Sequence, residues 1–172
     1  MFKLLFDPVS EIKSFRKQSY AHVLLYLLAA SLFETIGLLF FAWRYFSKFF
    51  TPNILVYGIV GTLFSLIVIH IVVAFFFSLA MHVLDGKGGY YEGLTTLVLA
   101  MVAPAVATFF AGAISFLSAP VAALILAYGY VIGFATLFRS GKELFELDYA
   151  GVLIGFLITA VPLGFACAIF LR

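Results

Sequence analysis

Long apolar runs alternate along this chain with a few short polar segments. No Asp, Glu, Lys or Arg occurs within 49–84, 93–138 or 149–171. About 20 apolar residues are enough to cross a bilayer as a helix, so the middle run is long enough for two crossings. Pro120 supplies a break inside that run, because proline disfavours helix at the preceding residue and suits a first helical turn. The pattern therefore predicts five transmembrane helices, at 20–43, 54–81, 95–117, 121–138 and 149–171.

Composition places the chain in the same class. Hydrophobic residues make up 65% of the sequence and charged residues 10%, whereas about a quarter of the residues of a soluble domain are charged. We expect an all-α integral membrane protein with a single domain over 1–172, surrounded by lipid. The net charge of +2 gives no reason to expect a nucleic-acid partner. The single cysteine, Cys167, excludes an intrachain disulfide.

The segment 1–19 mixes apolar and charged residues. Asp7 followed by Pro8 is typical of a helix start, and Val9, Ile12 and Phe15 then repeat at helical spacing. This pattern favours a short amphipathic helix at the membrane surface. The alternative is a basic topogenic segment without that helix, and both interpretations place 1–19 in the cytoplasm.

The distribution of basic residues predicts the orientation of the helices. With the N-terminus inside, seven Lys and Arg residues face the cytoplasm and three face outward. The inner set is Lys3, Lys13, Arg16, Lys17, Lys87, Arg139 and Lys142, and the outer set is Arg44, Lys48 and Arg172. Because cytoplasmic loops carry the excess of positive charge, we expect the N-terminus inside and the C-terminus outside.

A glycine-rich polar segment, 82–95, interrupts the apolar sequence between the second and third predicted helices. Its three closely spaced glycines allow backbone conformations that other residues avoid, which predicts a tight, specifically shaped turn. With 139–148 and 1–19 it forms a cytoplasmic face suited to a protein partner. The residues expected on this face are Asp7, Pro8, His82, Asp85, Gly86, Gly88, Gly89, Tyr90 and Glu92. Their spacing matches no metal-ligand motif, so neither a metal nor a cofactor is predicted.

Two polar residues, Glu34 and His70, fall inside predicted membrane helices. A carboxylate at bilayer depth costs at least about 2.5 kcal/mol, so Glu34 is either a proton, cation or substrate site or a protonated carboxyl that ties helices together. Counted at about 1.5 Å per residue from the outer helix ends, Glu34 lies roughly 13 Å deep and His70 roughly 24 Å. We therefore expect no direct relay between them, and expect His70 to bond a neighbouring carbonyl or hydroxyl.

Small residues recur at helical spacing in the predicted helices, as at Gly129 and Gly133 or Gly151 and Gly155. Such stripes allow close backbone approach in lipid, either between helices of one chain or between copies in a homo-oligomer. Signatures of hydrolases, phosphate-binding loops and zinc proteases are missing from the sequence, which favours a non-enzymatic protein.

Two segments carry a family resemblance. Leu4-Leu5-Phe6-Asp7-Pro8 before the first helix, and His82-x-x-Asp-Gly-Lys-Gly-Gly-Tyr-Tyr-Glu-Gly-Leu94 with Pro104 in the next helix, resemble the Yip family of five-span membrane proteins. The resemblance implies a cytoplasmic N-terminus and, in eukaryotic members, vesicle trafficking with Rab-type GTPases. Those members have a long N-terminal region with an Asp-Leu-Tyr-Gly-Pro motif, to which only Asp7-Pro8 corresponds. A bacterial or archaeal plasma-membrane member is therefore the better match.

Two functions follow as hypotheses. The first is a Yip-type protein that organises the bilayer or scaffolds partners through its cytoplasmic face. The second is a small-solute or ion transporter or channel, which would use Glu34 and His70 as its polar site within the membrane. Water-filled space around Glu34 would favour the second hypothesis.

Overall fold

The computed structural model describes residues 12, 15 and 18–170, except for the side chains of 166, 167 and 170. The described residues form helices and connections without a strand. Asp7 and Pro8 lie outside the described residues, as does most of the segment 1–19. The elements are α3 (Tyr20–Phe46), the 3-10 turn η1 (Ser47–Phe49), α4 (Pro52–Val83), α5 (Tyr90–Ser115), α6 (Ala119–Phe145) and α7 (Tyr149–Phe170).

Helix starts follow local signals in the sequence. The Thr51 hydroxyl accepts a hydrogen bond from the Ile54 backbone N–H, with Pro52 in the first turn of α4. Ser118 caps α6 in the same way through the Val121 N–H, and Pro120 lies in the first turn. Two predicted boundaries are wrong. α5 starts at Tyr90 rather than at 95 because Gly89 and Glu92 form its N-terminal cap, and α6 continues to Phe145 through a polar stretch predicted as loop.

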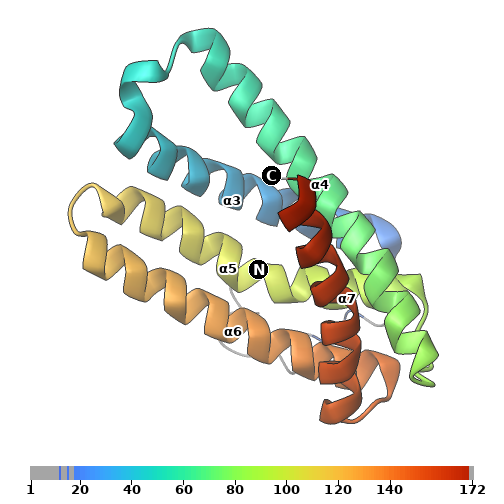
Figure 1. Ribbon diagram of the computed structural model, residues 1–172. Coiled ribbons are helices and arrows are strands. Elements are labelled where there is room, and N and C mark those ends of the chain that lie inside the picture. The colour runs from blue at the N-terminus through green and yellow to red at the C-terminus, as the bar shows by residue number, and fades with distance from the viewer. Residues whose placement is uncertain (1–11, 13–14, 16–17, 171–172) are drawn as a thin grey trace.

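The helix α5 lies at the centre of the bundle. It packs against α3, α4 and α6, and most of its residues between Gly93 and Ser115 are buried. Figure 1 shows α5 and α6 side by side, with α3 on the other flank of α5 and α4 leaving α3 at a wide angle. Backbones approach closely where α3 crosses α5, because a Cβ added at Gly112 would lie 2.5 Å from the Gly37 carbonyl oxygen. Intramolecular packing thus uses the glycines of this crossing.

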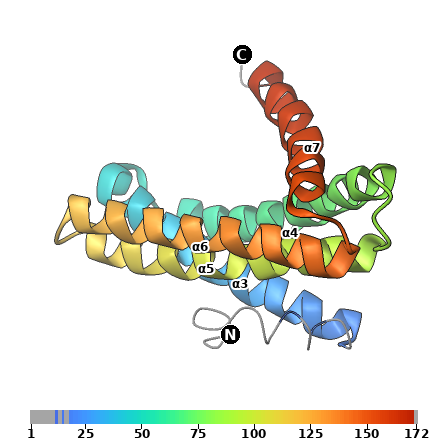
Figure 2. The same cartoon turned by 90° about the horizontal axis from the view of Figure 1, so that it is seen from below.

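The helix α7 differs from the others in its direction. It packs against α4 and α6 near its start, where Phe156 makes edge-to-face contacts with Phe134 and Phe138. Beyond that contact it projects away from the other helices, as Figure 2 shows. Helices α3 to α6 are long and apolar enough to cross a membrane, whereas α7 contributes a shorter apolar stretch, Tyr149–Phe165. The all-α membrane class is supported, and a fifth crossing stays a prediction.

Two residues of the N-terminal segment belong to the core. Ile12 and Phe15 are helical and fully buried, and the Phe15 ring contacts Tyr26 edge to face with centroids 4.9 Å apart. The Tyr91 hydroxyl lies 2.9 Å from the Phe15 carbonyl oxygen and 2.6 Å from that of Gln18. Docking onto the bundle, rather than contact with lipid alone, therefore holds these two residues in place.

Candidate functional site

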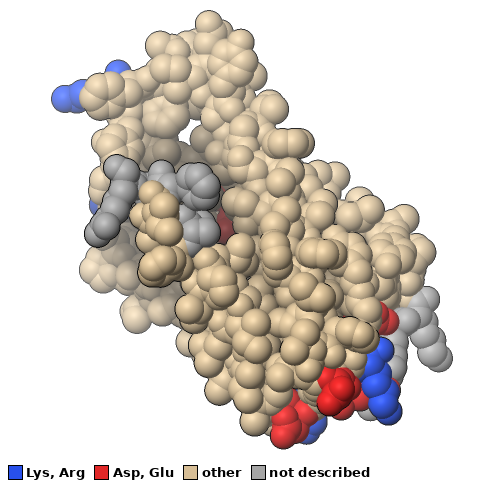
Figure 3. Space-filling model, turned by 45° about the vertical axis from the view of Figure 1, so that its right-hand side comes forward, with Lys and Arg blue, Asp and Glu red and all other residues tan. Residues whose placement is uncertain are grey.

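A cavity of about 230 Å³ lies among four helices, at the level of the middle of α5. It forms beside α5 because α4 and α6 flank that helix without packing closely on each other. On the face shown in Figure 3, the red of an acidic side chain is visible at the bottom of a hollow in the tan apolar surface. The lining residues are Glu34 from α3; Ile69, His70 and Val73 from α4; Leu97, Ala100, Met101 and Pro104 from α5; and Tyr130, Gly133, Phe134 and Leu137 from α6.

Glu34 contributes the cavity's only formal charge among these lining residues. Its side chain is partly buried, and no other Asp or Glu occurs between 12 and 84. Lys and Arg are missing from the lining, so no ion pair neutralises the carboxylate there. The group must hold a proton, hydrogen-bond to neighbours or meet a ligand that carries the missing charge.

His70 faces the cavity with a defined tautomer. Its Nδ1 lies 2.7 Å from the Leu66 carbonyl oxygen, one helical turn earlier. A carbonyl only accepts, so Nδ1 carries the proton, and in the neutral ring Nε2 is left as an acceptor. The predicted bond from His70 to a neighbouring carbonyl is confirmed.

The depth count underestimated the approach of Glu34 to His70. Both side chains line the same cavity, and they are close enough to interact electrostatically. The count treated the helices as upright with level ends. In the structure α4 crosses the bundle at an angle to α3 (Figure 1). Because of that tilt, residues at different distances from their helix ends lie at the same depth.

Pro104 opens the backbone of α5 at the cavity wall. Proline has no N–H, so the Ala100 carbonyl loses its usual partner one turn later. Gly133 of α6 lies directly against this carbonyl, since a Cβ there would be 2.8 Å from the Ala100 oxygen and 2.6 Å from the Pro104 Cγ. A glycine at this position lets the two backbones meet at the cavity wall.

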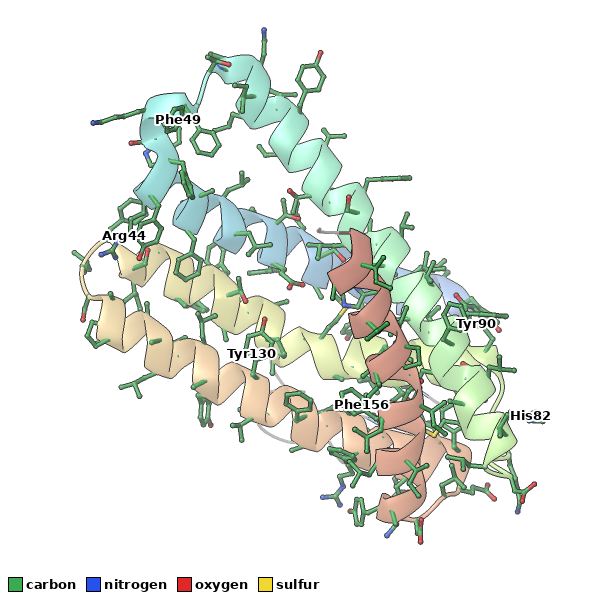
Figure 4. The ribbon with its side chains drawn as sticks, in the orientation of Figure 1. Arg44, Phe49, His82, Tyr90, Tyr130 and Phe156 are labelled. Carbon is green, nitrogen blue, oxygen red and sulfur yellow. The ribbon has the colours of Figure 1, made fainter. Side chains whose placement is uncertain are left out.

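Tyr130 completes the polar lining, and it was not among the residues predicted from the sequence. Its side chain lies close enough to Glu34 for the two to interact electrostatically. The Thr108 hydroxyl donates to the Pro104 carbonyl oxygen at 2.8 Å, one turn earlier in α5. Figure 4 shows the Tyr130 ring on α6 reaching toward α5. The available signal was its position next to Gly129 and near Gly133, the two glycines that pack against α5.

The predicted glycine turn has a specific shape, but for a different reason from the one expected. None of the described glycines has a positive φ, and Asp85 adopts the left-handed conformation instead, with φ 63°. The Gly86 N–H donates to the Met81 carbonyl and the Asp85 N–H to the His82 carbonyl, which is a Schellman ending of α4. Glycine is required at 86 and 88 by space: a Cβ would lie 2.8 Å from the Met81 oxygen and 2.6 Å from Phe145 Cδ1, respectively.

The glycine turn and the α6–α7 connection form one corner. The Lys87 N–H donates to the Phe145 carbonyl oxygen at 2.9 Å, and its ammonium lies 2.9 Å from a Glu146 carboxylate oxygen. Glu146, like Asp85, has a positive φ. Figure 3 shows acidic and basic side chains together at this end of the molecule. The structure thus brings the polar segment 82–95 next to residues 145–148, and a partner face at this corner stays a prediction.

The remaining residues of the predicted face have local roles. The Glu92 carboxylate accepts from the Gly89 N–H at 2.8 Å and caps α5. Tyr90 begins that helix, and the exposed His82 lies in the last turn of α4, where Figure 4 shows it at the edge of the molecule. Among the described residues no group of three or more His, Cys, Asp or Glu is placed to hold a metal ion.

The fold and the cavity define an all-α membrane protein with a polar site inside its helix bundle. Comparisons with family models, with curated proteins and with solved structures find no match for the chain.

Proposed function

We propose that this chain is a non-enzymatic integral membrane protein that binds a small polar solute or ion in the Glu34 cavity and moves it across the membrane. The observation that carries the proposal is the convergence of Glu34, His70 and Tyr130 on one cavity within apolar helices. A carboxylate within apolar helices, without a Lys or Arg partner, is costly unless water or a ligand reaches it. The cavity beside the Glu34 carboxylate has room for such a ligand.

Thiol labelling tests whether water reaches the cavity. In a Cys167→Ser background, Val73→Cys places a thiol in the lining, and Val72→Cys places one on the exposed outer surface of the same helix. A membrane-impermeant, charged thiol reagent applied to proteoliposomes should modify Val73→Cys and leave the lipid-facing Val72→Cys unmodified. Equal and negligible labelling of both variants would reject the cavity as a solute site.

A flux assay tests transport itself. Proteoliposomes with the wild-type chain should conduct a small cation that empty vesicles retain, and Glu34→Gln should abolish that flux. Glu143→Gln is the matched control, because Glu143 lies on α6 near its polar end and outside the cavity lining. Flux that survives Glu34→Gln unchanged would argue against the proposal.

A second candidate is the Yip-type role, scaffolding of partners or organisation of the bilayer at the cytoplasmic face. The observation that favours it is the corner formed by Lys87, Phe145 and Glu146. A plasma membrane of a bacterium or archaeon would be its location. Crosslinking in native membranes would test it: partners should be recovered with the wild-type chain and lost when Gly88→Ala pushes Phe145 away.

A further inference from the structure

We infer that the ligand of the Glu34 cavity is a small organic ammonium ion with a short alkyl body. This inference rests on the proposed function and names the chemical class that the cavity would select. It follows from the kinds of hydrogen-bonding groups in the lining, from the volume and from the apolar walls.

The polar groups of the cavity are mostly acceptors. The Glu34 carboxylate and the His70 Nε2 both accept hydrogen bonds. The Tyr130 hydroxyl lines the same cavity, and a phenol hydroxyl can accept as well as donate. An ammonium group has only donors, so it satisfies such a set, whereas a carboxylate or phosphate would face acceptors without a single Lys or Arg in the lining.

Charge supports the same choice. A buried carboxylate without a partner is unfavourable, and a cation held against it removes that cost. The ligand thereby supplies the positive charge that the lining omits. Tyr130 and Phe134 place aromatic rings in the same wall, and aromatic faces attract organic cations.

The walls distinguish an organic cation from a bare metal ion. Calcium takes about six to eight oxygen ligands and magnesium about six. The lining offers fewer oxygen donors than that and surrounds them with Ile69, Val73 and Leu97, which would contact an alkyl chain. The volume of about 230 Å³ is below the range of about 300–1,000 Å³ typical of drug-sized ligands, so the body is short.

Three probes of matched size and different charge test the inference on the wild-type chain. Calorimetric titration of the purified protein in detergent at neutral pH with butylammonium chloride, sodium butyrate and 1-butanol compares a cation, an anion and a neutral molecule. Butylammonium should bind at least about tenfold more tightly than the other two, the discrimination expected when charge-assisted hydrogen bonds are made or lost. Butyrate or butanol binding as tightly as butylammonium would overturn the inference.

Protection of a cysteine locates the probe. Butylammonium should slow labelling of Val73→Cys, and butyrate should not. Labelling without protection by butylammonium would place the probe elsewhere and overturn the inference while leaving the proposed function intact. No labelling at all would reject the proposed function itself, so the two failures are distinguishable.

Two substitutions check the groups that bind. Glu34→Gln should weaken butylammonium binding at least about tenfold. Tyr130→Phe should weaken it less, and Tyr128→Phe is its matched control, because Tyr128 lies on the same helix, is 70% exposed and is not part of the lining. Unchanged binding in a folded Glu34→Gln protein would overturn the assignment.

The ammonium could arrive as a free amine or as the headgroup of a lipid, and competition separates these sources. Phosphatidylethanolamine added to the micelles should displace butylammonium if a headgroup occupies the cavity, whereas phosphatidylglycerol should not. Displacement by phosphatidylethanolamine supports a lipid source, and its lack supports a free amine. Equal displacement by phosphatidylglycerol would contradict recognition of the ammonium group.

Discussion

The crossing of α3 over α5 gives the sharpest test of the fold. A Cβ added at Gly37 would lie 2.5 Å from the Thr108 carbonyl carbon and 2.6 Å from the Phe109 nitrogen. Ordinary van der Waals contact begins at 3.4 Å. The neighbours are backbone atoms, which cannot rotate away, so Gly37→Ala must push the two helices apart. Since α5 also packs on α4 and α6, that displacement disturbs the rest of the bundle.

The expected cost of Gly37→Ala is about 1–3 kcal/mol in the free energy of unfolding, the usual range for an added methylene in a packed interior. Gly61→Ala is the matched control in the exposed part of α4, where an added Cβ meets nothing within 4 Å. Alanine favours helix over glycine by up to about 1 kcal/mol, so the control should be neutral or more stable. The same substitution should therefore have opposite effects at these two positions.

The assay is unfolding in dodecyl maltoside micelles titrated with sodium dodecyl sulfate. Trp43, the single tryptophan, reports on the C-terminal end of α3, where its ring lies 5.7 Å from that of Phe50. Gly112→Ala should behave like Gly37→Ala, and the double variant should lose less than the sum, because the first methyl already separates the helices. Equal midpoints for Gly37→Ala and Gly61→Ala would refute a backbone contact at this crossing.

Three further substitutions test the polar end of the molecule. Asp85→Gly should raise the free energy of unfolding by about 0.5–1 kcal/mol, because glycine adopts the left-handed conformation without strain; a lower unfolding midpoint would contradict the Schellman ending. Asp148→Ala should lower the free energy of unfolding by about 1 kcal/mol, because the Asp148 carboxylate accepts a hydrogen bond from the Gly151 N–H at 2.6 Å and caps α7. Asp148→Asn should retain most of that stability. Tyr91→Phe removes the hydroxyl that binds the carbonyl oxygens of Phe15 and Gln18, so limited trypsin digestion should cleave the N-terminal segment faster than in Tyr90→Phe.

The apolar helices could be predicted from the sequence, because the length of an apolar run depends only on local composition. The absence of Asp, Glu, Lys and Arg over long runs predicted helices that agree with α3 to α6 in place and type. The break predicted at Pro120 was local as well, and Pro120 lies in the first turn of α6. The C-terminal end of α6 could not be predicted from the sequence. Its last turns are polar, and contacts of Ser140, Gly141 and Phe145 with other parts of the chain hold them in place.

The glycine turn lies between these cases. Its glycines predicted a shaped corner, and the corner exists, but the left-handed residue is Asp85. Gly88 is needed because Phe145, more than 50 residues later, lies against it. A sequence pattern records that a small residue is present, and only the packed neighbours show whether conformation or space requires it.

The cavity was decided by the tertiary structure. The sequence determined that Glu34 and His70 lie within apolar helices, and therefore that each carries a cost in the membrane. Whether they meet depends on helix tilt, on the close approach that Gly133 permits at Pro104, and on the gap between α4 and α6. These are properties of helix packing, which joins residues far apart in the sequence, so residue counts along single helices could not place Glu34, His70 and Tyr130 around one site.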